Sequence, residues 1–400
     1  MRRSAVSSAT FEVMRFTLFP VSLVVVMACE PARDVSQLPK VNAEDPHAFV
    51  VPETKITKAS SSMEPDAIEQ AFQAASATLL HEEFDAAAIA FDELVAADPQ
   101  GPSAGPSLYN AGMAYAGKGD LTTAAARFRA SAELDPAAPT SRLAWVRTSR
   151  MNAYLENWDE LESVADKLLA RGDLSVLERI EALGAKALSL VERGRVDEAY
   201  AVIVKARNQI EDRQLGQAGT PPLELAQVAF ALGEIRKAKS EKLLFDPMPS
   251  DFGAVLEDRC TGLLDAQAAF TDAMRSNDAH WSAMAGFRVG QLYQNLHRDV
   301  IKVPAPSRTA TVKSRQLWEG AMRLRYRVLL EKGLKMMEGT VSLGERTGES
   351  SLWITRAREA KLDLENALAL EKEALTKLPY TEEELRKVLE DVKKKPVPKP

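Results

Sequence analysis

Apolar residues recur at helical spacing through most of the chain beyond residue 63, and this arrangement repeats at longer range. Two core-type positions four residues apart occur four times, at offsets of 37, 37 and 38 residues. The four copies are Ala87 with Phe91, Ala124 with Phe128, Leu161 with Ala165, and Ala199 with Ile203. A single helix pair cannot bury its apolar face alone, so this periodicity predicts an all-α fold of helix pairs stacked in succession.

Composition agrees with that fold class and narrows the function. Hydrophobic residues make up 46% of the 400 residues and aromatic residues 6%, with alanine and leucine abundant. Such a balance favours helices, because alanine and straight-chain residues lose little conformational freedom in a helix. The net charge of −6 provides no general electrostatic footprint for nucleic acid.

The second copy of the repeat resembles the tetratricopeptide repeat (TPR). The matching residues of this copy are Gly112, Tyr115, Leu121, Ala124, Phe128 and Pro136. The family repeat has 34 residues, and the loop at residues 101–106 accounts for the extra three here. The third and fourth copies lack the terminal proline. This resemblance implies a solenoid of helix pairs over residues 64–213 that binds other proteins.

Beyond residue 215 the phase is lost, although helical patterns continue over residues 222–378. Long helices are expected at 223–244, 311–338 and 350–377, with a further repeat-like helix around Val289 to Tyr293. Trp281, the segment 285–290 and Tyr293 resemble the carboxy-terminal region of deltaproteobacterial envelope TPR proteins. Residues 379–400 are expected to form a short helix and a basic tail rich in Pro and Lys. Thr381 and Glu384 form a capping box at the start of that helix.

The amino terminus has the pattern of an export signal. Arginines precede an apolar run from Phe16 to Ala28, which is too short to span a bilayer comfortably but fits a signal peptide of residues 1–28. The run ends in Val26-Met27-Ala28-Cys29, which resembles the lipobox of bacterial lipoproteins and implies lipidation of Cys29. Met27 departs from the usual small or β-branched residue. Translation could start at Met1 or Met14, and a plain signal peptide remains the alternative.

Residues 29–63 are rich in Pro, Ser, Asp and Lys and lack a sustained apolar period, so they are expected to form a flexible tether. Glu30 follows the cysteine where inner-membrane retention usually has aspartate. By that resemblance the protein is expected on the outer membrane facing the periplasm, with the inner membrane and the cell surface left open.

The sequence contains short matches to motifs of enzymes and metal sites, but the residues and elements around them do not fit those motifs. His81-Glu82-Glu83-Phe84-Asp85 lacks the second histidine of a zinc motif, and His81 is expected at a helix edge. Residues 101–105 match G-x-S-x-G, but helices are expected on both sides instead of the strand that a nucleophile elbow needs. No phosphate-binding or dinucleotide motif occurs. The sequence therefore predicts no catalytic residue, metal or cofactor. Cys260 is expected to be a small buried hydrophobe.

In the TPR family the first helix of each pair lines a concave, ligand-binding groove. By that resemblance the groove residues here are Tyr109, Asn110, Met113, Arg147, Arg150 and Tyr154. Asn110 matches the asparagine that holds peptide backbone or carboxylate in family members. Arg147 and Arg150 are expected to bind an acidic segment of a partner, although a solvated basic face is an equal alternative.

The sequence thus favours a membrane-anchored scaffold for protein–protein interactions in a bacterial envelope complex, not an enzyme. Gliding motility, secretion and outer-membrane assembly are the settings that the resemblances suggest. The alternative from another class is an envelope hydrolase with its site in the carboxy-terminal half, around His280 or His297. The basic tail could contact anionic lipid or a partner, or be merely solvated.

Overall fold

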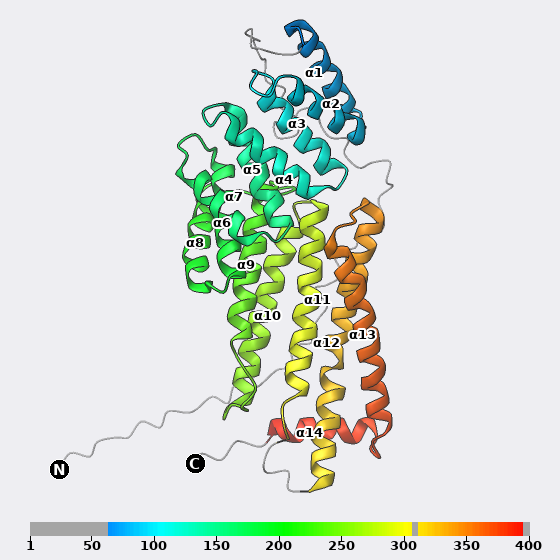
Figure 1. Ribbon diagram of the computed structural model, residues 1–400. Helices are drawn as coiled ribbons and strands as arrows, with labels where there is room; N and C mark the ends of the chain where they lie inside the picture. The colour runs from blue at the N-terminus through cyan, green and yellow to red at the C-terminus, as the bar shows by residue number, and fades with distance from the viewer. Residues whose placement is uncertain (1–62, 306–310, 395–400) are drawn as a thin grey trace, which may run out of the picture. The chain divides into compact units, whose positions relative to one another are not determined.

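A computed structural model describes residues 63–305 and 311–394, and within these ranges the chain forms fourteen α-helices and no strand (Figure 1). The described helices all fall in one compact unit. The predicted signal peptide, Cys29, the tether and the end of the basic tail lie outside the described residues. None of the described helices is long and apolar enough to cross a bilayer.

The first eight helices form four consecutive pairs, each packed on the next. Their bounds are Pro65–Leu80 (α1), Phe84–Ala97 (α2), Ala104–Gly117 (α3), Leu121–Leu134 (α4), Pro139–Tyr154 (α5), Trp158–Ala170 (α6), Val176–Glu192 (α7) and Val196–Asp212 (α8). Side-chain caps fix several starts: Asp120 accepts from the backbone N–H of Thr123, and Ser175 with Glu178 forms a capping box. The predicted helix-pair solenoid is confirmed.

Within a pair, a small residue on the first helix lets the second approach closely. A Cβ added at Gly112 of α3 would lie 2.7 Å from the ring of Phe128 on α4. Three residues before this glycine, Tyr109 meets the same ring edge-on, with centroids 5.4 Å apart. The first pair repeats this contact with Phe72 and Phe91, 5.6 Å apart. The aromatic ring therefore fills the space that the small residue leaves.

Helix pairing continues where the sequence phase is lost. The later helices are Glu224–Glu241 (α9), Phe252–Met274 (α10), Ala279–Ile301 (α11), Val312–Thr347 (α12), Leu352–Thr376 (α13) and Glu382–Lys394 (α14). In the α9–α10 pair a Cβ on Gly233 would lie 2.6 Å from Phe270, and Phe230, again three residues earlier, meets that ring at 5.2 Å. These longer helices move the small and aromatic partners further apart in sequence. The α9–α10 pair is therefore built like the four earlier pairs but does not follow their 37-residue spacing.

Helices α11 and α12 also approach closely at a glycine, where the facing side chain is a methionine instead of an aromatic ring. A Cβ on Gly290 of α11 would lie 2.6 Å from the methyl group of Met337 on α12. Helix α12 runs nine residues beyond its predicted end at residue 338, passing through Gly339 and stopping at Gly348, where φ is 74°. Glycine terminates a helix readily because it adopts this left-handed conformation without strain.

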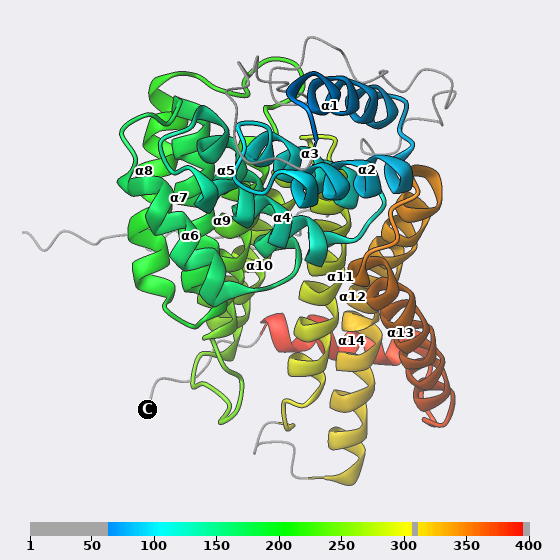
Figure 2. The same cartoon turned by 45° about the horizontal axis from the view of Figure 1, so that its top comes forward.

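Helix α14 crosses α12 near the latter's start (Figures 1 and 2). Leu378 and Leu385 pack against Gly320 of α12, where a Cβ would lie within 2.9 Å of both side chains. The predicted capping box is confirmed: Glu384 accepts from the Thr381 N–H at 2.8 Å, and the Thr381 hydroxyl accepts from the Glu384 N–H. Helices α9 to α14 confirm the predicted carboxy-terminal region of long helices.

We expect Gly233→Ala to lower the free energy of unfolding by about 1–3 kcal/mol, because the new methyl group would overlap the Phe270 ring. Gly339→Ala is the matched control: its Cβ would meet nothing within 4 Å, so a gain of up to about 1 kcal/mol is expected. Denaturant unfolding of both variants measures the difference. Equal stability of the two variants would contradict the close-approach account.

Candidate binding surface

The first helices of the early pairs, α1, α3 and α5, lie side by side, each packed on the next. Because the repeat is 37 residues, residues at that offset occupy the same position on neighbouring helices. Gln73, Asn110 and Arg147 are such a set, which we call the polar row. Gln73 is exposed and Arg147 half-buried, whereas Asn110 is 1% exposed.

The polar row is bordered by Tyr109 and Met113 of α3. The phenolic oxygen of Tyr109 accepts a hydrogen bond from Nε of Arg147 at 3.4 Å, so α3 and α5 are linked across the row. Met113 is half-buried and packs at the margin of the core. Nδ2 of Asn110 has no hydrogen-bond partner in the described structure. A buried donor without a partner loses about 1–3 kcal/mol relative to one that is satisfied, so an acceptor brought to it is favoured.

Arg150 does not fit its predicted role of binding an acidic partner. It is 5% exposed and donates from both Nε and Nη2 to the two carboxylate oxygens of Glu181 on α7, each at 2.9 Å. Burial alone would lower the pKa of the Arg150 guanidinium. The negative charge of Glu181 has the larger effect, so the pKa lies above its usual value. Burial likewise raises the pKa of Glu181, against the effect of Arg150. This ion pair joins two neighbouring repeats.

Tyr154 is also covered by the chain itself. Its ring lies against that of His280, with centroids 3.9 Å apart, and meets Trp281 at 5.3 Å. Its hydroxyl donates to Asp278 at 3.4 Å, and Asp278 is also the N-cap of α11. Burial, and then Asp278, raise the pKa of Tyr154 well above its usual value. Helix α11 therefore occupies the place where a ligand was expected to meet this residue.

The two histidines of the hydrolase alternative face separate carboxylates. His280 Nδ1 lies 3.4 Å from Glu349, and His297 Nε2 lies 3.8 Å from Glu371. Both histidines are buried. Within the described ranges no group of three or more His, Cys, Asp or Glu side chains could hold a metal ion.

Two further motif residues are where the sequence predicted them, whereas Cys260 is less buried than expected. His81 is the C-cap residue of α1, its N–H bonded to the carbonyl of Ala77. Ser103 precedes α3 in the loop after α2, so helices flank the G-x-S-x-G stretch. Cys260 is half-buried at the edge of the core, and burial raises the pKa of its thiol.

Sequence reasoning missed Gln73 and Glu181. Gln73 lies one repeat before Asn110, so the 37-residue phase itself could have found it. Glu181 lies on α7, the first helix of the pair that follows the pair of Arg150, 31 residues further along the chain. A carboxylate offset by about one repeat from an arginine on the inner side of a solenoid is a signal for such an inter-repeat pair.

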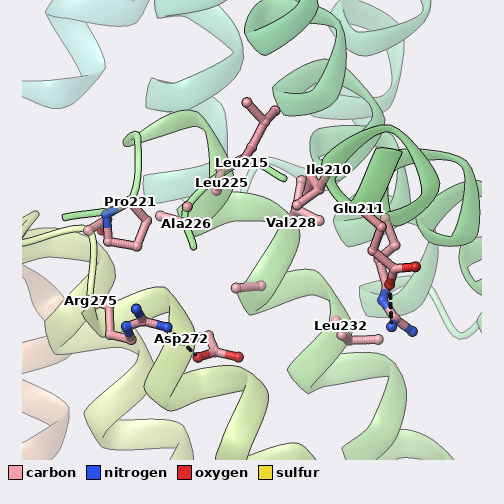
Figure 3. A pocket seen from close by; sticks show the side chains of 14 residues that line it. Ile210, Glu211, Leu215, Pro221, Leu225, Ala226, Val228, Leu232, Asp272 and Arg275 are labelled. Carbon is pink, nitrogen blue, oxygen red and sulfur yellow. Dashed lines mark hydrogen bonds and ion pairs between the residues drawn. The ribbon is translucent and has the colours of Figure 1, made fainter. Parts of the chain in front are cut away.

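A shallow apolar pocket of about 210 Å³ marks the break in the repeat phase (Figure 3). Its apolar lining comes from Ile210, Leu215, Pro221, Leu225, Ala226, Val228, Ala229 and Leu232. Helix α8 packs against α9 over less of its length than the corresponding earlier helices do, which leaves this face of α9 open. The ion pairs Arg207–Glu211 and Arg275–Asp272 stand at its rim. Ligand pockets are commonly 300–1,000 Å³, so this one is small for a ligand site.

Comparisons with known proteins identify no sequence family but a distantly similar solved structure. No protein-family model matches the chain, and no curated protein matches its sequence. Among solved structures, a tetratricopeptide repeat protein from Parabacteroides merdae aligns with 73% of this chain and 99% of its own, at 11% identity and a TM-score of 0.39. The helix-pair fold described here stands on its own packing contacts. It places the chain in the class of α-helical repeat proteins, whose usual work is binding other proteins.

We expect Arg150→Met to destabilise the protein by about 3–5 kcal/mol, because Glu181 would keep a buried charge without its partner. The double variant Arg150→Met/Glu181→Leu should recover most of that loss, since neither buried charge remains. Arg207→Met is the control, because the exposed Arg207–Glu211 pair contributes at most about 1 kcal/mol. A double-mutant cycle by denaturant unfolding measures these terms. If the double variant is no more stable than Arg150→Met, the loss does not come from the unpaired charge of Glu181, and this account is wrong.

Proposed function

We propose that the chain is a protein-interaction scaffold whose polar row binds an extended segment of a partner protein. The observation that carries this is Asn110, a buried amide donor without a partner, placed between an exposed glutamine and an arginine on adjacent helices. Peptide backbone supplies a carbonyl acceptor at every residue, which is what a row of amide and guanidinium donors can hold.

An acidic residue in the partner segment would add specificity at Arg147. Guanidinium binds carboxylate through two parallel hydrogen bonds, and charge-assisted bonds are about twice as strong as neutral ones. Arg150 is paired with Glu181, so we assign the acidic preference to Arg147, whose guanidinium also donates to Tyr109. Met113 offers an adaptable apolar contact beside it.

The cellular setting of this scaffold is proposed from the amino-terminal sequence. Export followed by lipidation at Cys29 would place the helices at a bacterial membrane, with the outer membrane favoured by Glu30. Two or more acyl chains give stable anchoring. A complex for gliding motility, secretion or outer-membrane assembly is the setting that the sequence resemblances support. An envelope hydrolase with a site near His280 or His297 remains the second candidate, and its support is a histidine beside a carboxylate at each place.

Site-specific crosslinking in cells tests the binding surface. A photo-crosslinking residue at Met113 should capture a partner protein, and Arg147→Glu in the same chain should reduce that capture at least tenfold by replacing attraction with repulsion. Arg346→Glu, at an exposed position on α12, should leave the capture unchanged. The proposed surface is wrong if Arg147→Glu and Arg346→Glu capture equally well.

Membrane fractionation tests the anchor separately. We expect Cys29→Ser to move the protein from the membrane fraction to the soluble fraction, because the thiol that accepts the lipid is gone. Retention of the Cys29→Ser chain in membranes would remove the lipid anchor from the proposal and leave the binding surface untouched.

A further inference from the structure

A cluster of charged side chains around a buried tryptophan is one of the contacts that join the carboxy-terminal helices to the repeats. Trp353 of α13 is 1% exposed, and the guanidinium groups of Arg288 and Arg356 lie 5.1 and 4.6 Å from its ring centre. We call this cluster the latch; its members are Glu156, Glu192, Glu234, Lys237, Arg288, Trp353 and Arg356.

Each arginine of the latch reaches back to a different part of the repeats. Arg288 of α11 contacts Glu192, the last residue of α7, at 3.2 Å, and Glu234 of α9 at 2.5 Å. Arg356 of α13 contacts Glu156, in the turn after α5, at 2.6 Å. Two carboxylates thus share the single guanidinium of Arg288, and both are largely withdrawn from water.

The latch lies close to the place where α11 covers Tyr154. His280 and Arg288 are eight residues apart on α11, which is about 12 Å along the helix. We propose that the latch is a proton-controlled device that keeps the carboxy-terminal helices closed over the end of the repeat surface and loosens when Glu192 loses its proton.

The electrostatics around Glu192 support this assignment. Burial and the nearby Glu234 carboxylate raise the pKa of Glu192 from 4.5 to about 7, although Arg288 and Lys237 oppose the shift, and Glu156 adds to it. Burial would also raise the pKa of Glu234, but Arg288 and Lys237 outweigh burial and lower it. The closed latch therefore holds one proton, on Glu192, over a range where an exposed glutamate is ionised.

The direction of the pH effect follows from linkage. If opening exposes Glu192, its pKa returns towards 4.5, so the closed form binds more protons than the open form between about pH 4.5 and pH 7. The extra stability of the closed form is complete below pH 4.5 and is lost as the pH rises through 7. The ratio of open to closed latch should rise about tenfold per pH unit inside this window and level off above it.

Hydrogen–deuterium exchange on the full chain measures this opening, with exchange rates corrected for their intrinsic pH dependence. Peptides covering the start of α11 and the start of α13 should show the rise between pH 5 and pH 6.5, and peptides of α1 and α2 should not. Glu192→Gln, which cannot ionise, should stay closed and lose the pH dependence. Glu338→Gln, on the exposed face of α12, is the matched control and should keep the wild-type slope.

A second variant keeps the test decisive if Glu192→Gln folds poorly. Glu234→Gln removes the neighbouring negative charge, so the pKa of Glu192 should fall and the slope should end at a lower pH than in the wild type. A wild-type chain without the slope, or a slope that persists in Glu192→Gln, would overturn the latch. No partner protein takes part in this measurement, so its result is independent of the proposed binding function.

Discussion

Close contact between a small residue on one helix and a large side chain on the next is the constraint on which the rest of this structure depends. Gly112 with Phe128, Gly233 with Phe270, and Gly290 with Met337 set the approach of three helix pairs that differ greatly in length. Helices that approach this closely bury much of their apolar face, and the ring fills the remaining space at the packing density of a protein interior. Packing of each pair on the next brings the first helices of successive pairs side by side, and that alignment creates the polar row.

The same alignment brings buried polar and charged side chains together from distant parts of the chain. Tyr154 meets Asp278 across 124 residues, and Arg288 meets Glu192 across 96. A buried ion pair adds little net stability, because the loss of hydration offsets the attraction, but an unmatched buried charge is strongly unfavourable. Such pairs therefore penalise any arrangement of the carboxy-terminal helices in which the partners do not meet. They select one docking geometry while adding little to total stability.

The sequence predicted those features that a local pattern carries. The 37-residue phase identified the four early pairs through Ala124 and Phe128, and Thr381 with Glu384 identified the start of α14. The fifth pair was not recognised, because longer helices changed the spacing between Gly233 and Phe270 while leaving their contact the same.

For the binding surface, sequence reasoning placed the candidate residues on helices but accounted only in part for their exposure. The TPR resemblance selected Asn110, Arg147, Arg150 and Tyr154 by their position on a helix face. The position of a residue on a helix decides the direction in which its side chain points. Whether that side chain is buried depends on what packs against that face of the helix. Glu181 and His280, which cover two of these side chains, come from a later repeat and from the carboxy-terminal half. A pattern within one repeat contains no information about either.

Polar groups with and without a partner in the chain lie at different places on the repeat surface. On α5, Arg150 is matched within the chain by Glu181 and Tyr154 by Asp278. Towards α1, Asn110 keeps a donor without a partner and Gln73 is exposed. A segment bound along the polar row crosses two steps between neighbouring helices, about 20 Å at 8–10 Å each, which about six extended residues can span. On the proposed function, a segment of about this length is what the polar row would hold.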